Sequence, residues 1–270
     1  MLRASTSAGA SSGHRQLRRS AASLSPCVPC QARGRCARLA VLAHGAGEAP
    51  TATRVKPEKE KGFINEMRMV AMKLHTRDQA PKEGQQPAQP MVWTPTRQGY
   101  LKFLAESKVV YDALEAVAND PAYPEYAPLR NTGLERSQAL AADLEWFKQQ
   151  YGLEVPPAGP DSPGAQYAAK VTALAKSDPP AFICHYYNFY FAHTAGGRMI
   201  GNKVSEMLLD KHTLAFYQWS GDVAALLDAV RVKINSLAEG WSREQKDHCL
   251  AETQESFKMS GVIMRCITEV

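Results

Sequence analysis

The sequence has no uninterrupted apolar run long enough to span a membrane, and no apolar segment of the secretory type near its start. It also has no glycine-rich phosphate loop, no G-x-S-x-G turn and no paired Glu-x-x-His motifs. These absences argue against a membrane span, a secretory signal, a phosphate-loop enzyme, an α/β-hydrolase and a di-iron helical bundle.

Acidic residues are almost missing from the first 56 residues, which hold only Glu48 against eight arginines and Lys56. This segment carries about +8, so residues 57–270, by difference from the +5 of the whole chain, carry about −3. An arginine- and serine-rich, acid-poor N-terminus is typical of an organelle transit peptide. We therefore predict a disordered transit peptide over residues 1–56. A nucleic-acid-binding arm is the alternative, and it is disfavoured because no aromatic residue interleaves the arginines.

Cysteine is scarce in the remainder of the chain. The spacing Cys27-x-x-Cys30, with Cys36, resembles a metal site, but all three fall in the predicted transit peptide. The others are Cys184, Cys249 and Cys266. Because these three are scattered and odd in number, we expect buried thiols rather than disulfides or a zinc site.

Alternating strand patterns and internal repeats are also absent from residues 57–270, where apolar residues recur at helical spacing. We predict helices over 62–76, from Thr94-Pro95 to 117, over 132–152, 165–175 and 222–237, and from 242 onward, with a short helix holding His212, Phe216 and Trp219. Two of the helix starts are capping boxes, Thr132-x-x-Glu135 and Ser242-x-x-Gln245. The domain is therefore expected to be all-α and a single compact bundle.

The stretch from Phe182 to Leu209 has helical periodicity but carries Gly196 and Gly197 in its middle, and Gly201 one turn on. Each glycine costs about 1 kcal/mol relative to alanine in a helix interior, so a tandem pair needs a reason. One explanation is a loop between two helices or a close helix crossing. The other is a flat ligand that approaches the bare backbone.

His75 lies at the edge of the buried face of the first helix, and Arg68 lies two turns earlier on the same side, about 10 Å along the axis. Alone, such a histidine is more often a core residue than a ligand. Together with a glycine-interrupted helix, it supports a haem pocket, because an imidazole can hold iron from one side and leave the other open. Arg68 and Arg231 could then pair with propionates and Tyr187 could donate a further hydrogen bond.

Three segments carry a family resemblance: MVAMKLHT around His75, HTAGGRMIG at 193–201 and RVKINSL at 231–237. They resemble the haem oxygenases, and closely the chloroplast type of plants and green algae, in the family's order and over residues 60–270. The resemblance implies an all-helical haem oxygenase domain over 57–270, with haem b, both substrate and cofactor, between a proximal helix and a kinked distal helix. It also implies cleavage of haem to biliverdin IXα, carbon monoxide and ferrous iron for bilin synthesis. O₂ and electrons from reduced ferredoxin would drive the reaction in the chloroplast stroma.

Carried over by position, the resemblance makes His75 the proximal iron ligand and Gly196 and Gly197 the distal glycine pair. The propionate partners and the pocket aromatic become Arg68, Tyr187, Arg231 and Phe257. Two positions depart from animal and bacterial relatives. His193 stands where those relatives have an aspartate that organises water next to the iron-bound oxygen. The plastid branch also has histidine there, and His193 is a candidate to hold that water. Met72 replaces a second basic residue one turn before His75.

The resemblance also suggests partners. Lys73, Arg198 and Lys203 are candidates for docking an acidic ferredoxin, although a solvated basic face explains them equally well. A bilin reductase would act downstream, and the chain is expected to be a monomer. The alternative functions are a non-catalytic haem or tetrapyrrole-binding protein of the plastid, against which His75 argues, and a helical scaffold without a ligand.

Overall fold

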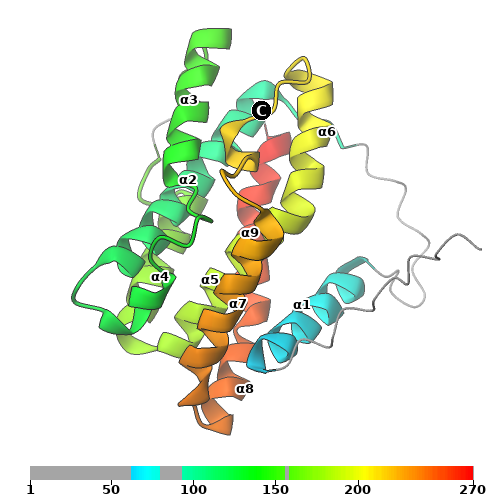
Figure 1. The fold of residues 1–270 in the computed structure, drawn as a ribbon. Coiled ribbons are helices and arrows are strands. Elements are labelled where there is room, and N and C mark those ends of the chain that lie inside the picture. Colours follow the sequence, from blue (N-terminus) through cyan, green and yellow to red (C-terminus); the bar gives the residue numbers. More distant parts are fainter. Residues whose placement is uncertain (1–61, 80–92, 156–157, 270) are drawn as a thin grey trace, which may run out of the picture. The chain divides into compact units, whose positions relative to one another are not determined.

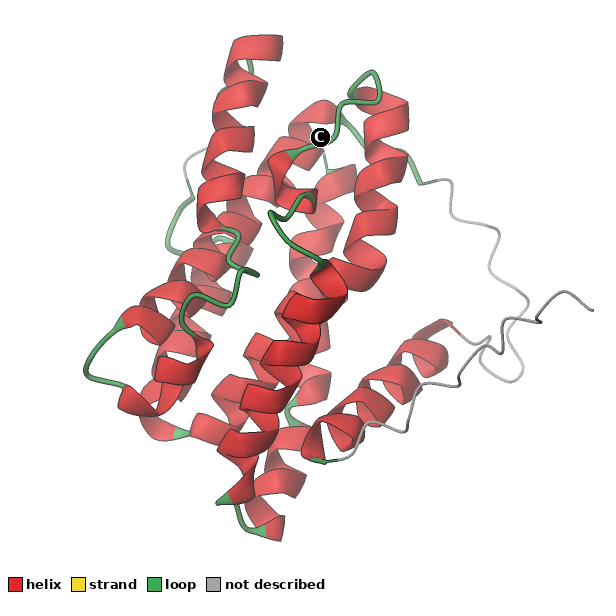
Figure 2. Cartoon of the chain, viewed as in Figure 1, coloured by secondary structure: helices red, strands yellow, loops and turns green. Residues whose placement is uncertain are grey.

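The computed structural model of the protein describes residues 62–79, 93–155 and 158–269, and each regular element in these residues is helical (Figures 1 and 2). The helices are α1 (Phe63–Gln79), α2 (Arg97–Asn119), α3 (Ser137–Tyr151), α4 (Pro163–Ser177), α5 (Pro179–Ala192), α6 (Arg198–Leu208), α7 (Val223–Glu239), α8 (Arg243–Ala251) and α9 (Thr253–Arg265). Short 3₁₀ segments are η1 (Pro124–Leu129), η3 (Ala215–Tyr217) and η4 (Cys266–Thr268), and η2 (His193–Gly197) is a π-helix. The predicted all-α fold is confirmed, and the described residues lie in one compact unit.

Helix α2 lies at the centre of the core, because it packs against α3, α4, α9 and η4. Its buried face includes Tyr100, Leu104, Tyr111 and Leu114, whose spacings of four, seven and three residues place them on one side of a helix. Much of the core is aromatic, and the fully buried rings are Tyr100, Tyr111, Tyr126, Tyr167, Tyr186, Tyr190, Phe147, Phe182 and Phe216. The hydroxyl groups of the six tyrosines therefore need polar partners inside the protein. The hydroxyls of Tyr100 and Tyr217, for example, lie 2.7 Å apart.

Two predicted helix starts are wrong. Helix α2 begins after Thr96, whose hydroxyl accepts a hydrogen bond from the Gly99 amide at 2.9 Å, rather than after Thr94. The Glu135 carboxylate does accept from the Thr132 amide, at 2.6 Å, but the two residues form a turn and α3 begins only at Ser137. The reason is that Gly133, between them, has a left-handed backbone (φ +81°), which a right-handed helix cannot contain.

The C-terminal part is divided differently from the prediction. The capping box of Ser242 and Gln245 is confirmed, but the single helix expected after it is two helices, α8 and α9, which meet at Glu252. Glu252 keeps near-helical backbone angles (φ −66°, ψ −14°), so the break is a local bend that periodicity does not reveal. The short helix predicted around Phe216 is one 3₁₀ turn, and His212 and Trp219 lie outside it.

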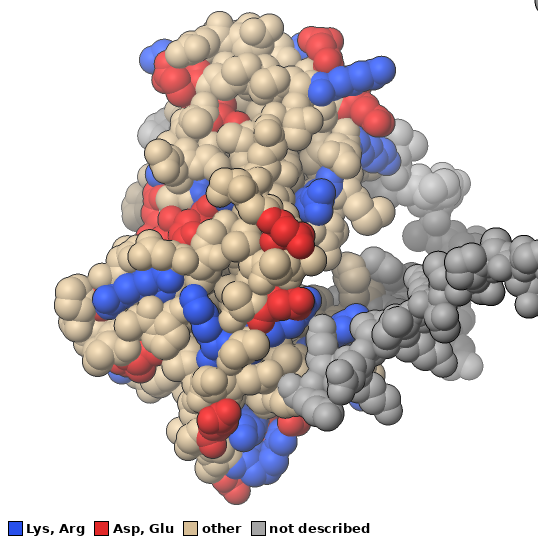
Figure 3. Space-filling view, viewed as in Figure 1, with Lys and Arg blue, Asp and Glu red and all other residues tan. Residues whose placement is uncertain are grey.

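The remaining sequence predictions concern thiols, membranes and the N-terminus. Cys184, Cys249 and Cys266 are free and buried, as predicted. No helix in the described ranges is long and apolar enough to cross a bilayer. Acidic and basic side chains are interspersed over the face shown in Figure 3. Residues 1–56, including Cys27, Cys30 and Cys36, lie outside the described residues.

Candidate functional site

A cavity of about 1230 Å³ lies between α1 on one side and the α5–η2–α6 segment on the other, with α9 along its wall. His75 and Arg68 line it from α1, and His193, Gly196 and Gly197 line it from η2. The two sets of residues are far apart in the sequence and were predicted to face one another. The cavity exceeds the usual range of ligand pockets, about 300–1000 Å³, so it has room for a large planar ligand.

His75 projects from the end of α1 that is exposed at the cavity. The start of the same helix is anchored in the core by Phe63, Ile64 and Met67, each at most 5% exposed. The ring of Phe257, on α9, lies edge-on to the His75 ring with centroids 6.3 Å apart, and Phe257 also lines the cavity. Neither ring nitrogen of His75 is hydrogen-bonded to another described residue. A neutral imidazole in this position can act as a metal ligand.

The predicted propionate partners do not all lie at the cavity. Arg68 and Tyr187 line it, and the Tyr187 ring packs on Phe191 with centroids 4.4 Å apart. Arg231 is not among the lining residues; its guanidinium lies 5.2 Å from the Phe191 ring and forms an ion pair with Asp228 on the same helix. The Phe191 ring itself lines the cavity, so Arg231 is next to a lining residue.

The tandem glycines are not in a loop or at a helix crossing. The chain continues from α5 into α6 through the π-helix η2, in which the Arg198 amide donates to the His193 carbonyl. His193 and Gly197 both have right-handed helical angles (φ −62°, ψ −46° and φ −57°, ψ −42°). A π segment inside an α-helix is a recognised cause of bending and is frequent at functional sites. The predicted interruption is thus a change of helix type.

The three glycines differ in what their missing side chains permit. Apart from its own helix backbone and chain neighbours, a Cβ atom at Gly196 would meet no protein atom within 4 Å, so the space beside this cavity-lining residue is open. A Cβ atom at Gly197 would lie 3.0 Å from Nδ1 of His193. At Gly201 it would lie 2.5 Å from the Tyr217 ring, so this third glycine does serve close packing. The bare backbone at Gly196 suits a flat ligand.

His193 is buried and its orientation is set by Phe216. Its Nε2 donates to the Phe216 carbonyl at 2.8 Å, and the two rings are stacked with centroids 3.9 Å apart. Burial lowers the pKa of His193 to about 3, although the bond to the Phe216 carbonyl opposes the shift. The imidazole is therefore neutral near pH 7, so it can accept a hydrogen bond but is not a proton reservoir.

Acidification is expected to reduce stability through His193. Its pKa is about 3 in the folded protein against an ordinary 6.5, so the folded state favours the neutral ring. The stability that the neutral His193 ring gives the folded protein is fully present above pH 6.5 and is lost as the pH falls from 6.5 toward 3. Between pH 7 and pH 5 this residue should cost about 2 kcal/mol of unfolding free energy. Urea unfolding of the full chain at both pH values measures it.

The control for this prediction is His193→Gln, which should lose about 2 kcal/mol less than the wild type over the same interval. Asp143 acts in the opposite direction, because burial raises the pKa of its carboxyl group to about 6. That contribution is common to both proteins and cancels in the comparison. Equal pH slopes in the two proteins would contradict a buried neutral His193.

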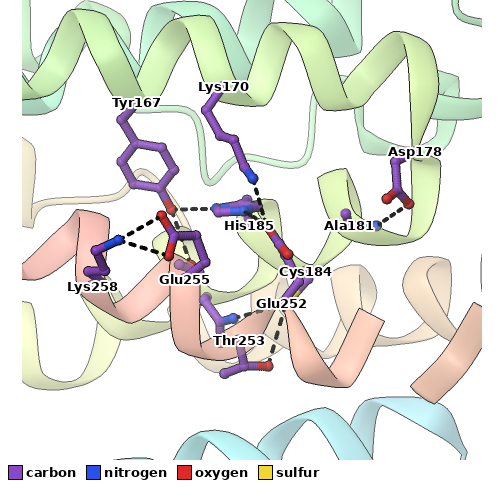
Figure 4. A network of polar contacts seen from close by, with 12 residues as sticks. Tyr167, Lys170, Asp178, Ala181, Cys184, His185, Glu252, Thr253, Glu255 and Lys258 are labelled. Carbon is purple, nitrogen blue, oxygen red and sulfur yellow. Dashed lines mark hydrogen bonds and ion pairs between the residues drawn. The ribbon is translucent and has the colours of Figure 1, made fainter. Parts of the chain in front are cut away.

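Sequence reasoning missed a second buried histidine, His185. In Figure 4 side chains from α4, α5 and the α8–α9 junction converge on it. Its Nδ1 is 2.9 Å from the Tyr167 hydroxyl and its Nε2 is 3.0 Å from the Glu252 carboxylate, which also pairs with Lys170 at 3.1 Å. In the sequence, the only sign of this network was that His185 is a histidine within a tyrosine-rich apolar segment. Its partners are 18 and 67 residues away in the chain, so periodicity could not find them.

Replacing His185 by leucine should lower the free energy of unfolding by about 1–3 kcal/mol, because Tyr167 and Glu252 lose a partner in the interior. Chemical denaturation of the full chain measures this. The matched control is His248→Leu, since His248 is half exposed and pairs with Asp178 at 2.6 Å on the surface. That change should cost under about 1 kcal/mol. Equal losses of unfolding free energy in the two variants would show that the buried hydrogen bonds of His185 contribute no more to stability than the surface pair of His248.

The basic residues proposed for docking are exposed, and two of them lie against tryptophans. Arg198 lies 5.9 Å from the Trp219 ring and Lys203 lies 5.0 Å from the Trp93 ring. Lys73 is exposed on α1. Arg198 and Lys203 therefore belong to α6, on one side of the cavity, and Lys73 belongs to α1, on the other side.

Comparison with known proteins gives a consistent result. The heme oxygenase family model matches residues 62–266. The chain is 54% identical over 217 residues to heme oxygenase 1, chloroplastic, of Arabidopsis thaliana, which covers 78% of this chain and 76% of the relative. It is 52% identical over 221 residues to the rice protein of the same name, with 81% and 75% covered. The fold is similar to that of heme oxygenase-1 from the cyanobacterium Synechocystis in complex with heme, with a TM-score of 0.59, 20% identity, and 76% and 92% covered.

Proposed function

The chain belongs to the haem oxygenase family, and from this premise we propose that it cleaves haem b to biliverdin IXα, carbon monoxide and ferrous iron, using O₂ and electrons from reduced ferredoxin. The observation that carries the proposal is the shared cavity: an imidazole without a described hydrogen-bond partner, His75, faces it from α1, and the bare backbone of Gly196 faces it from η2. These two features suit a flat macrocycle with a central metal.

Several residues would hold haem. His75 would bind the iron through one ring nitrogen. Phe257, edge-on to His75, would limit rotation of that ring. Arg68 and Tyr187 line the cavity and would contact the propionates, whereas Arg231, which lies over the Phe191 ring, would approach them from outside the present lining. When bound, haem supplies both the ring that is cleaved and the iron at which O₂ is activated.

The residues of η2 would keep bulky side chains away from the ligand and would position a water molecule. Gly196 and Gly197 keep side chains away from the cavity surface, so their backbone can approach the ligand closely. His193 would accept a hydrogen bond from a cavity water at Nδ1, because its Nε2–H is committed to Phe216. Since the pKa of His193 is about 3, the ring would orient this water without supplying the proton itself.

The cellular setting is part of the proposal. We propose a chloroplast transit peptide over residues 1–56, a haem oxygenase domain over 57–270 and a location in the stroma, supported by the chloroplastic names of the relatives and by the arginine-rich, acid-poor leader. The domain would act as a monomer and provide biliverdin to a bilin reductase. Lys73, Arg198 and Lys203 would form the ferredoxin contact on either side of the cavity.

Reconstitution of the full chain tests the function. Haemin is added and its absorption spectrum followed, and then reduced ferredoxin is supplied in air. The proposal expects a bound-haem spectrum that is replaced by that of a bile pigment, with release of carbon monoxide. Binding without conversion would support the non-catalytic binding protein instead. No binding would leave a helical scaffold.

A further inference from the structure

The Phe216 peptide determines which nitrogen of His193 carries the proton. Nε2 lies 2.8 Å from the Phe216 carbonyl oxygen, which can only accept a hydrogen bond. A neutral imidazole has one N–H, so the proton must be on Nε2 and Nδ1 must be an acceptor. Stacking of the Phe216 ring on the imidazole, at 3.9 Å, prevents the ring from turning over freely.

Nδ1 is left at the cavity. It is the atom that an added Cβ at Gly197 would approach to 3.0 Å, so it lies directly beside the glycine pair. No other described residue is hydrogen-bonded to it, and His193 is among the residues that line the cavity. Nδ1 is therefore an acceptor beside Gly197, in a residue that lines the cavity.

The η3 turn that carries Phe216 is itself held by a buried carboxylate on α3. Oδ1 of Asp143 accepts from the Ala215 amide at 2.8 Å, and Oδ2 accepts from the Phe216 amide at 2.7 Å. The side chain is only 3% exposed, and burying a carboxylate is costly unless such donors are provided. Asp143 has no contact with the cavity, so its function has to be exerted through the turn.

A guanidinium completes the clamp from the other side of the turn. Arg136, the residue before α3, donates from Nη1 to the Gln218 carbonyl at 2.6 Å and lies 3.3 Å from the Phe216 carbonyl. It also covers the Trp219 ring at 4.6 Å. Both ends of the η3 turn are thus tied to the start and first turns of α3.

We propose that Asp143 is a positioning residue for His193: by holding the η3 turn through the Ala215 and Phe216 amides, it keeps the Phe216 carbonyl in place. It thereby keeps the proton of His193 on Nε2 and leaves Nδ1, beside Gly197, as the acceptor. The inference rests on the proposed function for its catalytic consequence, which is the orientation of a distal water by His193. It does not rest on that function for the structural claim, because every contact of the clamp is made between protein atoms.

The first test measures the tautomer directly in the full chain without haem. The protein is labelled with ¹⁵N-histidine, and His193 is assigned among the seven histidines by comparison with His193→Gln. The expected spectrum has a protonated Nε2 and an unprotonated Nδ1 in a single, fixed tautomer at pH 7. A proton on Nδ1, or rapid averaging of the two nitrogens, would overturn the proposal whether or not any variant folds.

The second test uses Asp143→Asn. The amide keeps one acceptor but turns its NH₂ group toward the other backbone amide, so one of the two bonds is lost. The two His193 nitrogen signals should move toward each other, Nε2–H should exchange faster with water, and the pKa of His193 should rise toward its ordinary value. Unchanged His193 signals in the folded variant would overturn the proposal.

Two control variants separate positioning from general loss of stability. Asp222→Asn alters a carboxylate that accepts from the Ala224 amide at the start of α7, where asparagine is an equally good cap, and it should leave His193 unchanged. His185→Leu should destabilise the protein yet also leave the His193 signals in place. With haem, Asp143→Asn should lower kcat about tenfold or more, with haem affinity within about twofold. A change in His193 signals in either control would overturn the assignment to Asp143.

Discussion

Replacing His75 by alanine is expected to lower the rate of haem cleavage by more than about 100-fold, because loss of even an indirect support of a metal ligand typically costs 10–100-fold. The free energy of unfolding should change by less than about 0.5 kcal/mol, since the side chain is exposed at the cavity and, among the described residues, its ring contacts only Phe257. Steady-state turnover with reduced ferredoxin and denaturation of the same preparations measure the two effects.

The histidine prediction has an internal and an external control. Added imidazole should occupy the space left by the side chain and restore part of the turnover in His75→Ala. His212→Ala removes another exposed histidine, which stacks on Trp146 at 4.1 Å outside the cavity lining, and it should retain wild-type turnover. Full activity of His75→Ala without imidazole would show that another group binds the iron.

Gly196→Leu should separate function from folding. A side chain at this position meets no protein atom at its Cβ, so it would extend into the cavity and displace the haem. A displacement of about 1 Å can cost about 100-fold in rate, and we expect at least that loss. Leucine is a better helix former than glycine, so the unfolding free energy should stay equal or rise by up to about 1 kcal/mol. Haem titration, turnover and urea unfolding distinguish these effects.

The matched control is Gly201→Leu, one turn further along the same helix. There a Cβ atom would lie 2.5 Å from the Tyr217 ring, so the change should destabilise the protein by about 1–3 kcal/mol or more through overpacking. The two glycine variants should therefore show opposite patterns of stability. If Gly196→Leu unfolded the protein as Gly201→Leu does, the cavity assignment of Gly196 would be wrong.

Local signals in the sequence were sufficient for much of the architecture. Apolar periodicity identified the helices from α1 to α9, although it merged α8 and α9, and the Ser242 capping box located the start of α8 correctly. The same motif at Thr132 failed, because Gly133 has a left-handed backbone that the motif cannot signal. A capping pattern thus predicts a helix only when the intervening residues can adopt helical angles.

The site was only partly accessible to sequence reasoning. The residue types and the family resemblance both indicated His75, Gly196 and Gly197, and the three residues line one cavity, while their roles stay predictions. Arg231 was predicted to contact a propionate from its position in the sequence, but it is not among the residues that line the cavity and its guanidinium lies over the Phe191 ring. Side-chain direction on a helix depends on the neighbouring helix as well as on register, so the sequence could not settle it.

By itself the sequence determined that the protein is helical, that it belongs with the haem oxygenases and that a histidine and a glycine pair are its informative residues, because periodicity and motifs are local properties. Only the tertiary structure decided what His193 can do. Its hydrogen-bond partner is 23 residues away, and the Asp143 carboxylate that holds this partner is 73 residues from it. Packing of η3 between α3 and η2 creates these contacts and removes the imidazole from water. It thereby makes His193 a neutral acceptor rather than an acid.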